Sequence, residues 1–355
     1  MSDLRFGIYC EMQTAPEKPH ADLIWEVFRL MEHADSLGYS VFSLIEHHCF
    51  PSFGISANPL AMFSAAAQRT RQLRFRTLCH TLPLHNPIVL AGEIAEADIL
   101  TDGRLEIGVG RGHGWLYEPL SIPMEESQQR YRESLDILHL AWSEERFSYH
   151  GNYYNVDNVS VVPKPLQRPY PKIYMTGTSG QAFTQAAERG WGICCGGPAP
   201  FEVFESSIET YRKACVQYGT QPDFGYIRGV FLADDENTAH REARDAILNF
   251  YEFNIRPHDS LLGDEALKER LKNSGYGFYA SDLLQGMRHF SYEELLEREM
   301  VWVGTPAQIT RKLEDFHAKV KFNEFNIVSH YGDIAPWKAY RTQELFARSV
   351  MPAFL

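Results

Sequence analysis

The stretch LRFRTLCHTLPLHNPIVLAGEIAEADILTDGRLEIGVGRG, residues 73–112, contains a strand–helix–strand unit. Its first run, 73–79, and its last run, 105–109, are short and apolar, as expected of buried parallel strands. Between them, residues 86–101 have the length and composition of a helix. Parallel strands joined in this way bring their carboxyl ends to the same edge of a sheet. The stretch therefore predicts an α/β fold with a parallel sheet.

The same alternation continues outward in both directions from this unit. Together with the two strands above, eight strand–helix pairs in a chain of 355 residues favour a (β/α)₈ barrel over an open sheet. The other predicted strands are 4–9, 39–46, 172–176, 191–195, 224–232 and 323–329, and the other predicted helices are 21–37, 58–71, 125–144, 181–189, 201–219, 236–252, one that begins at 304–306, and 336–349.

Two segments interrupt the alternation. Residues 145–170 are aromatic and rich in turn formers, which predicts a small hairpin. Residues 253–300 form a long connection with many aromatic residues and glycines, and we expect a lid over the active-site end of the barrel. The alternative is a packed surface subdomain with helices at 264–272 and 292–299. No linker divides the chain, so 1–355 is expected to be a single domain.

Composition excludes several classes of function. The chain has 34 Lys and Arg against 46 Asp and Glu, a formal net charge of −12, which argues against nucleic acid or an anionic membrane as partner. No apolar run reaches the roughly 18 residues needed to span a bilayer, and the first ten residues lack the basic start of a signal peptide. The six cysteines contain no CxxC pair, which indicates reduced thiols and a cytoplasmic protein.

Polar residues cluster where the predicted strands end. Glu46, His47 and His48 follow the second strand, and an imidazole at the carboxyl end of a barrel strand can hold or move a proton near neutral pH. The alternative is one packed and one solvated histidine. A metal site is not predicted, because no HxH, HExxH or Cys/His cluster with ligand spacing occurs. The absence of a GxSxG motif argues against a serine hydrolase.

The ends of two further predicted strands carry glycines and groups that could bind an anion. The sequence GVGRGHG at 108–114 lacks the GxGxxG spacing of a dinucleotide fold, but it places Gly110 and Arg111 at the end of a strand. Arg111 suits a phosphate or an electron-rich ring, unless it is merely solvated. In TGTSG at 176–180, Thr178, Ser179 and Gly180 begin a helix, whose amide groups can bind an anion or simply form an ordinary cap.

Several motifs occur in a consistent order along nearly the whole chain. They are GYSVFSLIEHH at 38–48, TLPLHNPIVLAGEIAEADILTDGRLEIGVGRG at 81–112, MEESQQRY at 124–131, YMTGTSG at 174–180 and VGTPAQI at 303–309. With these motifs the sequence resembles the bacterial luciferase-like flavin-dependent monooxygenases.

The resemblance implies a (β/α)₈ barrel that binds reduced FMN as a co-substrate and reacts it with O₂. A C4a-hydroperoxyflavin then oxidises a small apolar organic substrate such as an aldehyde, ketone, alkane or terpene. A separate NAD(P)H:flavin reductase would supply the reduced FMN, in keeping with the missing GxGxxG motif. The resemblance also implies a homodimer, formed through the helices near 58–71 and 86–101.

Site residues follow from the same resemblance. His47, the first histidine of the EHH motif, is implied to be catalytic and to lie close to the reactive carbon of the flavin. Leu78 and Cys79 match the non-prolyl cis peptide beneath the flavin ring. Gly110 stands where a reactive cysteine often occurs in luciferase.

The phosphate of FMN is implied to bind at two neighbouring strand exits. Arg111 matches an arginine that reaches the phosphate, and Thr178, Ser179 and Gly180 match the phosphate-binding turn. The chain departs from luciferase here, because Thr178 replaces a glutamate and Ala182 replaces a hydroxyl donor.

Two alternatives remain open within this resemblance. One is a deazaflavin-dependent dehydrogenase of the same fold, which transfers a hydride without O₂ and needs a basic site for a long acidic tail. The other is a non-catalytic flavin-binding subunit, against which the retention of His47, Arg111 and the GTSG turn argues. Incubation with each reduced cofactor would separate the first alternative from the monooxygenase.

Overall fold

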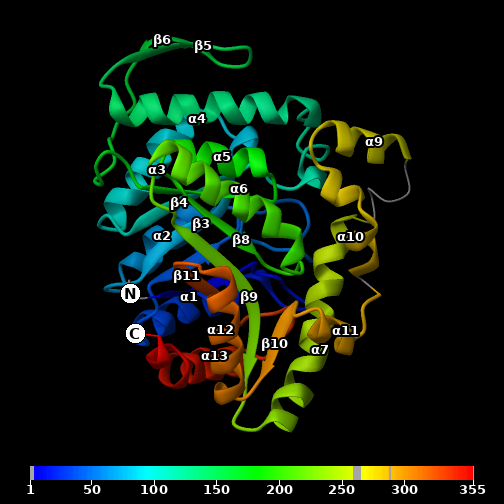
Figure 1. Ribbon diagram of the computed structural model, residues 1–355. Helices are drawn as coiled ribbons and strands as arrows, with labels where there is room; N and C mark the ends of the chain where they lie inside the picture. Colours follow the sequence, from blue (N-terminus) through cyan, green and yellow to red (C-terminus); the bar gives the residue numbers. More distant parts are fainter. Residues whose placement is uncertain (1–3, 259–264, 288, 355) are drawn as a thin grey trace.

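The structure is a computed structural model that describes residues 4–258, 265–287 and 289–354 (Figure 1). Eight parallel strands form a closed ring, because β9 pairs with β8 on one side and with β11 on the other. This confirms the predicted (β/α)₈ barrel. The strands of the ring are β1 (Arg5–Cys10), β2 (Val41–Leu44), β3 (Arg74–Thr81), β4 (Leu105–Gly110), β7 (Lys172–Thr176), β8 (Gly192–Gly196), β9 (Phe224–Leu232) and β11 (Glu324–Val328).

The sheet of the barrel has a ninth strand that was not expected from the sequence. β10 (Val301–Gly304) pairs in parallel with the second half of β9, while β11 pairs with the first half. This strand was not apparent in the sequence because it directly follows the second insertion, where the alternation of strands and helices is interrupted. The helix predicted to begin at 304–306 does begin there, directly after β10.

Helices surround the ring and cover the outer faces of its strands (Figure 1). Their starts agree with local capping: Asn58, Asn86 and Asp235 each accept a backbone N–H of the first turn, and Thr305 forms a capping box with Gln308. The helices are α1 (His20–Ser36), α2 (Pro59–Ala67), α3 (Pro87–Leu100), α4 (Ser127–Ser143), α5 (Gly180–Glu188), α6 (Glu202–Tyr218), α7 (Glu236–Ile255), α12 (Pro306–Val320) and α13 (Pro336–Ser349).

The predicted hairpin is present. Strands β5 (Phe147–His150) and β6 (Asn155–Val159) pair antiparallel and project beyond α4 at the top of Figure 1. The buried carboxylate of Glu133 on α4 accepts the backbone N–H groups of Asn152, Tyr153 and Tyr154. These bonds hold the turn of the hairpin against the body of the protein.

The second insertion folds into short helices, some of which lie beside α7 (Figure 1). They are η4 (Arg256–His258), α9 (Glu265–Asn273), η5 (Gly277–Ala280), α10 (Asp282–Met287) and α11 (Tyr292–Glu297). The helices expected at 264–272 and 292–299 correspond to α9 and α11. Residues 259–264 and 288 of the expected lid lie outside the described residues.

The amino-terminal half of the barrel interior is closed by buried charges. The guanidinium of Arg76 donates to Glu106 at 2.7 Å and to Glu324 at 2.9 Å, and all three side chains are almost completely buried. Such a paired network fills this end of the barrel, so an open space can exist only toward the carboxyl ends of the strands.

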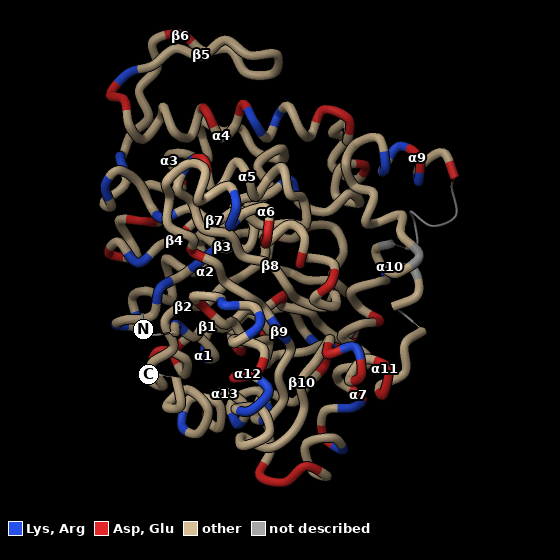
Figure 2. Tube along the Cα trace, viewed as in Figure 1, with Lys and Arg blue, Asp and Glu red and all other residues tan. Residues whose placement is uncertain are grey.

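Figure 2 shows acidic and basic residues distributed over many of the outer helices and loops. Within the described residues, no helix has the length and apolar character needed to cross a lipid bilayer.

Candidate active site

A cavity of about 340 Å³ opens at the carboxyl ends of the strands. Its walls come from the ends of β1, β3, β4, β7 and β8, from the loop after β2, and from the second insertion. Six of the eight residues predicted for the site line it: Leu78, Cys79, Gly110, Arg111, Thr178 and Ser179. This is the end of a (β/α)₈ barrel at which active sites are built.

The floor of the cavity is formed where β3 and β4 end. The peptide bond between Leu78 and Cys79 is cis, as the resemblance implies. A Cβ at Gly110 would lie 2.6 Å from the sulfur of Cys79 and 2.8 Å from the hydroxyl of Thr176, so only glycine fits between them. Burial raises the pKa of Cys79 to about 11, which keeps the thiol protonated at neutral pH.

Arg111 reaches the wall of the cavity and is bonded to the second insertion. Its guanidinium donates to the carbonyl oxygens of Ser274 at 2.7 Å and Gly275 at 2.9 Å, and it lies 4.4 Å from the ring centre of Tyr276. The sequence did not predict these bonds, because the partners are more than 160 residues away. A permanent cation therefore lies at the junction of barrel and insertion.

The TGTSG turn lies at the start of α5, as predicted. Thr178 and Ser179 line the cavity, and Ser207 donates to the carbonyl oxygen of Thr178 at 2.7 Å, which fixes the turn. Gly180 is the first residue of α5 and is not among the lining residues. A Cβ at Gly180 would lie 3.6 Å from the side chain of Thr210, so this glycine faces α6.

His47 is buried directly behind the cavity wall. Its ring centre lies 4.3 Å from that of Phe53, which lines the cavity, whereas His47 itself is not among the lining residues. Neither ring nitrogen has a hydrogen-bond partner. Burial, followed by the neighbouring His113 and His48, holds the pKa of His47 well below its usual range, so the imidazole is neutral at physiological pH.

Aromatic side chains form the wall next to His47. His113 and Trp115 stack with ring centres 4.2 Å apart and planes 10° apart, and His113 bonds the hydroxyl of Tyr279 at 2.9 Å. Burial lowers the pKa of His113 to about 3. The wall is therefore uncharged and aromatic at neutral pH.

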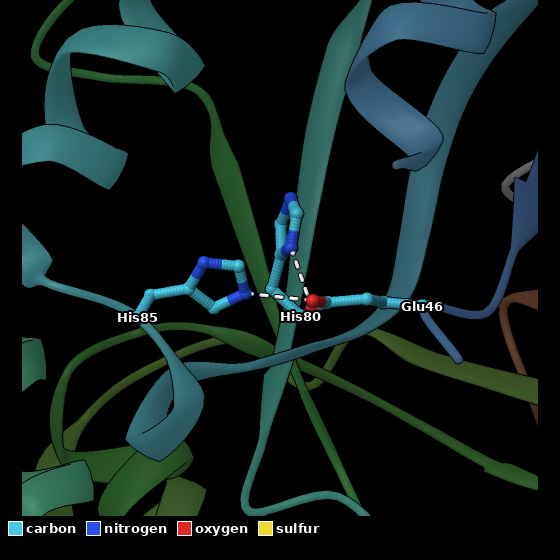
Figure 3. A group of neighbouring side chains, drawn as sticks. All are labelled: Glu46, His80 and His85. Carbon is cyan, nitrogen blue, oxygen red and sulfur yellow. Dashed lines mark hydrogen bonds and ion pairs between the residues drawn. The ribbon is translucent and has the colours of Figure 1, made fainter. Parts of the chain in front are cut away.

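A second histidine cluster was missed in the sequence. Glu46 accepts hydrogen bonds from His80 at 3.0 Å, from His85 at 2.7 Å and from His48 at 2.8 Å, as Figure 3 shows for the first two. It also accepts the backbone N–H of Thr81 at 2.9 Å. These bonds outweigh the effect of burial and hold the pKa of Glu46 well below its usual range. The spacing of 34 residues between Glu46 and His80 gives no local signal.

Among the described residues, Glu46, His80 and His85 lie close enough together to hold a metal ion. Their ligand atoms lie within 4.8 Å of one another. The carboxylate of Glu46 already accepts four hydrogen bonds, and these account for the arrangement without a metal. What the cluster does is join the EHH segment after β2 to the end of β3.

One acidic residue of the cavity was also missed. Glu11, which directly follows β1, is 4% exposed and lines the cavity. One of its oxygens, Oε2, accepts from the amide of Gln13 at 3.2 Å and from that of Asn254 at 3.1 Å. Burial raises the pKa of Glu11 to about 8. An acid immediately after an apolar strand is the signal that could have found it.

Comparisons with known proteins identify the family of this chain. The family model for luciferase-like monooxygenases matches residues 4–320. An uncharacterised protein of Sinorhizobium fredii is 34% identical over 56% of this chain and 58% of its own length. The oxygenase component of the flavin-dependent trigonelline monooxygenase of Acinetobacter baylyi is 25% identical over 99% of this chain and 96% of its own length.

A solved structure extends the likeness to the whole fold. The oxygenating constituent of 3,6-diketocamphane monooxygenase from Pseudomonas putida, in complex with FMN, superposes with a TM-score of 0.80. It shares 22% identity and covers 99% of both chains. The chain described here belongs to the luciferase-like monooxygenase family.

Proposed function

We propose that this protein is the oxygenase of a two-component system, which uses reduced FMN and O₂ to oxidise a small organic substrate. The observation that carries the proposal is the convergence of Leu78, Cys79, Gly110, Arg111, Thr178 and Ser179 on one cavity at the carboxyl ends of the strands. Three separate strand exits contribute these residues, and family membership implies flavin chemistry for such a site.

The residues present suit a flavin mononucleotide. Arg111 and the amide groups at the start of α5 offer a cation and backbone donors to a phosphate. Gly110 leaves a space that any side chain would fill, beside the cis peptide of Leu78 and Cys79. Reduced flavin, when bound, supplies the electrons that activate O₂ for transfer of one oxygen atom to the substrate.

The chain's own residues control protons and water around that chemistry. His47 is neutral and has two unpartnered ring nitrogens, so it can accept or donate a proton once Phe53 gives access to it. The aromatic wall of His113, Trp115 and Tyr279 excludes water from the same region. Exclusion of water protects a reactive oxygen species from wasteful release as hydrogen peroxide.

The remaining walls are suited to an organic substrate. Ile45, directly after β2, adds apolar surface, as do Phe278, Leu284 and Met287 of the second insertion. A mainly apolar cavity with a few polar groups is typical of sites for small molecules. We therefore propose a substrate with an apolar or aromatic body, and a separate NAD(P)H:flavin reductase as partner.

The test is reconstitution with a flavin reductase, NADH and FMN. We expect the protein to bind FMN, to consume O₂ only when the reductase is present, and to form an oxygenated product from some members of a panel of aldehydes, ketones and aromatic compounds. Efficient NADH oxidation by the protein alone would contradict the proposal. Turnover with a reduced deazaflavin in place of reduced FMN would instead support the dehydrogenase alternative.

A further inference from the structure

A buried carboxyl group faces the cavity without a cationic partner. Glu11 lines the cavity beside Tyr9, Phe53 and Asn254. Among the described residues, no lysine, arginine or histidine forms an ion pair with it. Buried acids are normally paired, so an isolated one in a binding cavity requires an explanation.

The proposed flavin chemistry does not use Glu11. The groups offered to the phosphate come from Arg111 and the start of α5, at the ends of β4 and β7, whereas Glu11 follows β1. A Cβ at Gly54 would lie 2.3 Å from the carbonyl oxygen of Glu11 and 3.8 Å from the Cβ of His47. Glu11 therefore adjoins the segment that carries Phe53 and His47, where the substrate is expected.

Hydrogen bonds from Asn254, Gln13 and the hydroxyl of Tyr9 partly offset the effect of burial on Glu11. The amides of Gln13 and Asn254 both donate to Oε2, and two donors on one oxygen favour the ionised form over the neutral acid. Arg111, a permanent cation of the cavity, follows β4 and forms no ion pair with Glu11 among the described residues, and burial keeps His47 and His113 neutral. A bound cation would supply the missing charge.

Aromatic side chains in the same cavity also attract cations. Tyr9, Phe53, Trp115 and Tyr279 line the same cavity, and aromatic faces bind ammonium and pyridinium groups favourably. A carboxylate combined with aromatic walls is the set of groups that recognises a positively charged nitrogen.

We propose that Glu11 is a specificity-determining residue that binds a cationic nitrogen on the substrate, so that the substrate class is an aromatic or apolar compound carrying an ammonium or N-alkylated heteroaromatic group. The inference rests on the proposed oxygenase function and names the substrate class of that same cavity. It refines the apolar substrate implied by the resemblance by placing one positive charge on it.

Ionisation gives this proposal a distinct signature. In the free protein, burial raises the pKa of Glu11 to about 8, so most molecules carry the neutral acid at pH 7. A permanent cation binds to the ionised form and releases the proton to solvent. Its affinity should therefore rise about tenfold between pH 7 and pH 9 and then level off. A neutral compound of the same shape should show no such change.

The experiment uses the FMN-loaded protein and matched probes. Calorimetry measures binding of phenyltrimethylammonium and of its neutral isostere tert-butylbenzene, from pH 6.5 to 9.5. We expect tighter binding of the cation, release of a proton at pH 7, and the tenfold rise with pH. The Glu11→Gln variant should lose at least about tenfold in affinity for the cation and all of its pH dependence, with binding of the isostere unchanged.

Controls separate the outcomes. Glu17→Gln, an exposed acid six residues away, should behave as the wild type. Asn254→Ala removes one donor from Oε2 and should move the midpoint of the pH dependence upward, which a merely structural asparagine would not do. Equal binding of cation and isostere, or binding of acetophenone that depends on Glu11, would overturn the proposal. Failure to bind FMN would instead refute the proposed function, and loss of FMN binding in Glu11→Gln alone would show a structural role for this residue.

Discussion

At the scale of single residues, the cavity is set apart by burial of groups that usually titrate near neutrality. His47 and His113 both have depressed pKa values because the charged imidazolium would be buried among aromatic rings. Among the described residues that line the cavity, Arg111 at the edge of the insertion carries a permanent positive charge. The neutral histidines, which can hold a proton, and the permanent cation Arg111 thus occupy separate parts of the site. Each part can be tested by a substitution.

His47→Ala tests the proton-holding part. We expect FMN binding to be retained, while oxygenated product falls at least about tenfold and hydrogen peroxide rises in its place. Because His47 and His113 stay neutral from pH 6 to pH 8, the ratio of product to peroxide in the wild type should show no step from either group in that range. Assays of both products across pH check this, with the exposed His20→Ala as control. Unchanged product yield in His47→Ala would remove the residue from the mechanism.

Arg111→Ala tests the charged part. A charge-assisted hydrogen bond is worth about 1.5–3 kcal/mol, so affinity for FMN should fall roughly 10- to 150-fold. Riboflavin, which lacks the phosphate, should bind equally to both proteins. Fluorescence titration measures the two constants, and Arg348→Ala, at an exposed ion pair on α13, is the matched control. Parallel losses for FMN and riboflavin would show that Arg111 acts through the insertion and not through the phosphate.

Glu46→Gln tests the histidine cluster. Removing the charge leaves three imidazoles around a neutral amide, and breaking a buried charged pair costs about 3 kcal/mol or more. The depressed pKa of Glu46 means that its contribution is present above the unfolded value of about 4.3 and is lost as the pH falls below it. Urea unfolding at pH 5.5 should therefore show a larger loss than at pH 3.5. An equal loss at both pH values would contradict this role for the charge.

At the scale of elements, the repeated strand–helix units could be predicted from the sequence. Contacts between residues that are distant in the sequence could not. The eight strands of the ring were predicted because each is an apolar run bounded by turn residues. β10 was missed because it directly follows the second insertion, where the alternation of strands and helices is interrupted. The Glu46 cluster and the bonds of Arg111 to Ser274 were missed for another reason: their partners come from separate elements, and only the closed barrel brings them together. Glu11 could have been predicted from the sequence, because it is an acidic residue that directly follows the apolar strand β1.

The second insertion is the element whose function is most open to test. Residues 274–287 are described, carry both carbonyl groups that bind Arg111, and line the cavity with Tyr276, Phe278, Tyr279, Leu284 and Met287. Replacing 274–287 with a Gly/Ser linker should leave the fold and FMN binding intact. It should shift turnover several-fold from oxygenated product to hydrogen peroxide, because the cavity is opened to water.

The matched control replaces 148–158 of the hairpin with the same kind of linker. No residue of the hairpin lines the cavity, so product yield should not change. Circular dichroism and FMN titration report on the fold of both proteins. If replacement of 274–287 unfolds the barrel, the insertion is a packed subdomain and the lid hypothesis is wrong.

At the scale of the whole molecule, α3 carries three exposed apolar side chains that do not pack against the barrel. Val89, Ile99 and Leu100 are 58%, 44% and 47% exposed, on one of the two helices through which the family resemblance implies a homodimer. Exposed apolar side chains gathered on one element often mark an interface between chains. The prediction is that two copies associate through α3 and its neighbour α2.

Leu100→Glu should convert the dimer to a monomer. A charge placed without a partner in a buried interface costs several kcal/mol, which weakens association by about a hundredfold or more. Light scattering at micromolar concentration should give twice the mass of one chain for the wild type and a single mass for the variant. Val216→Glu, at an 85% exposed position on α6, should leave the dimer intact. A wild-type protein that is already monomeric would refute the homodimer, and a variant that stays dimeric would move the interface away from α3. Because α3 leads into β4, which ends in Gly110, the same variant reports whether the cavity needs the second copy: unchanged FMN affinity in the monomer would show that each barrel holds a complete site.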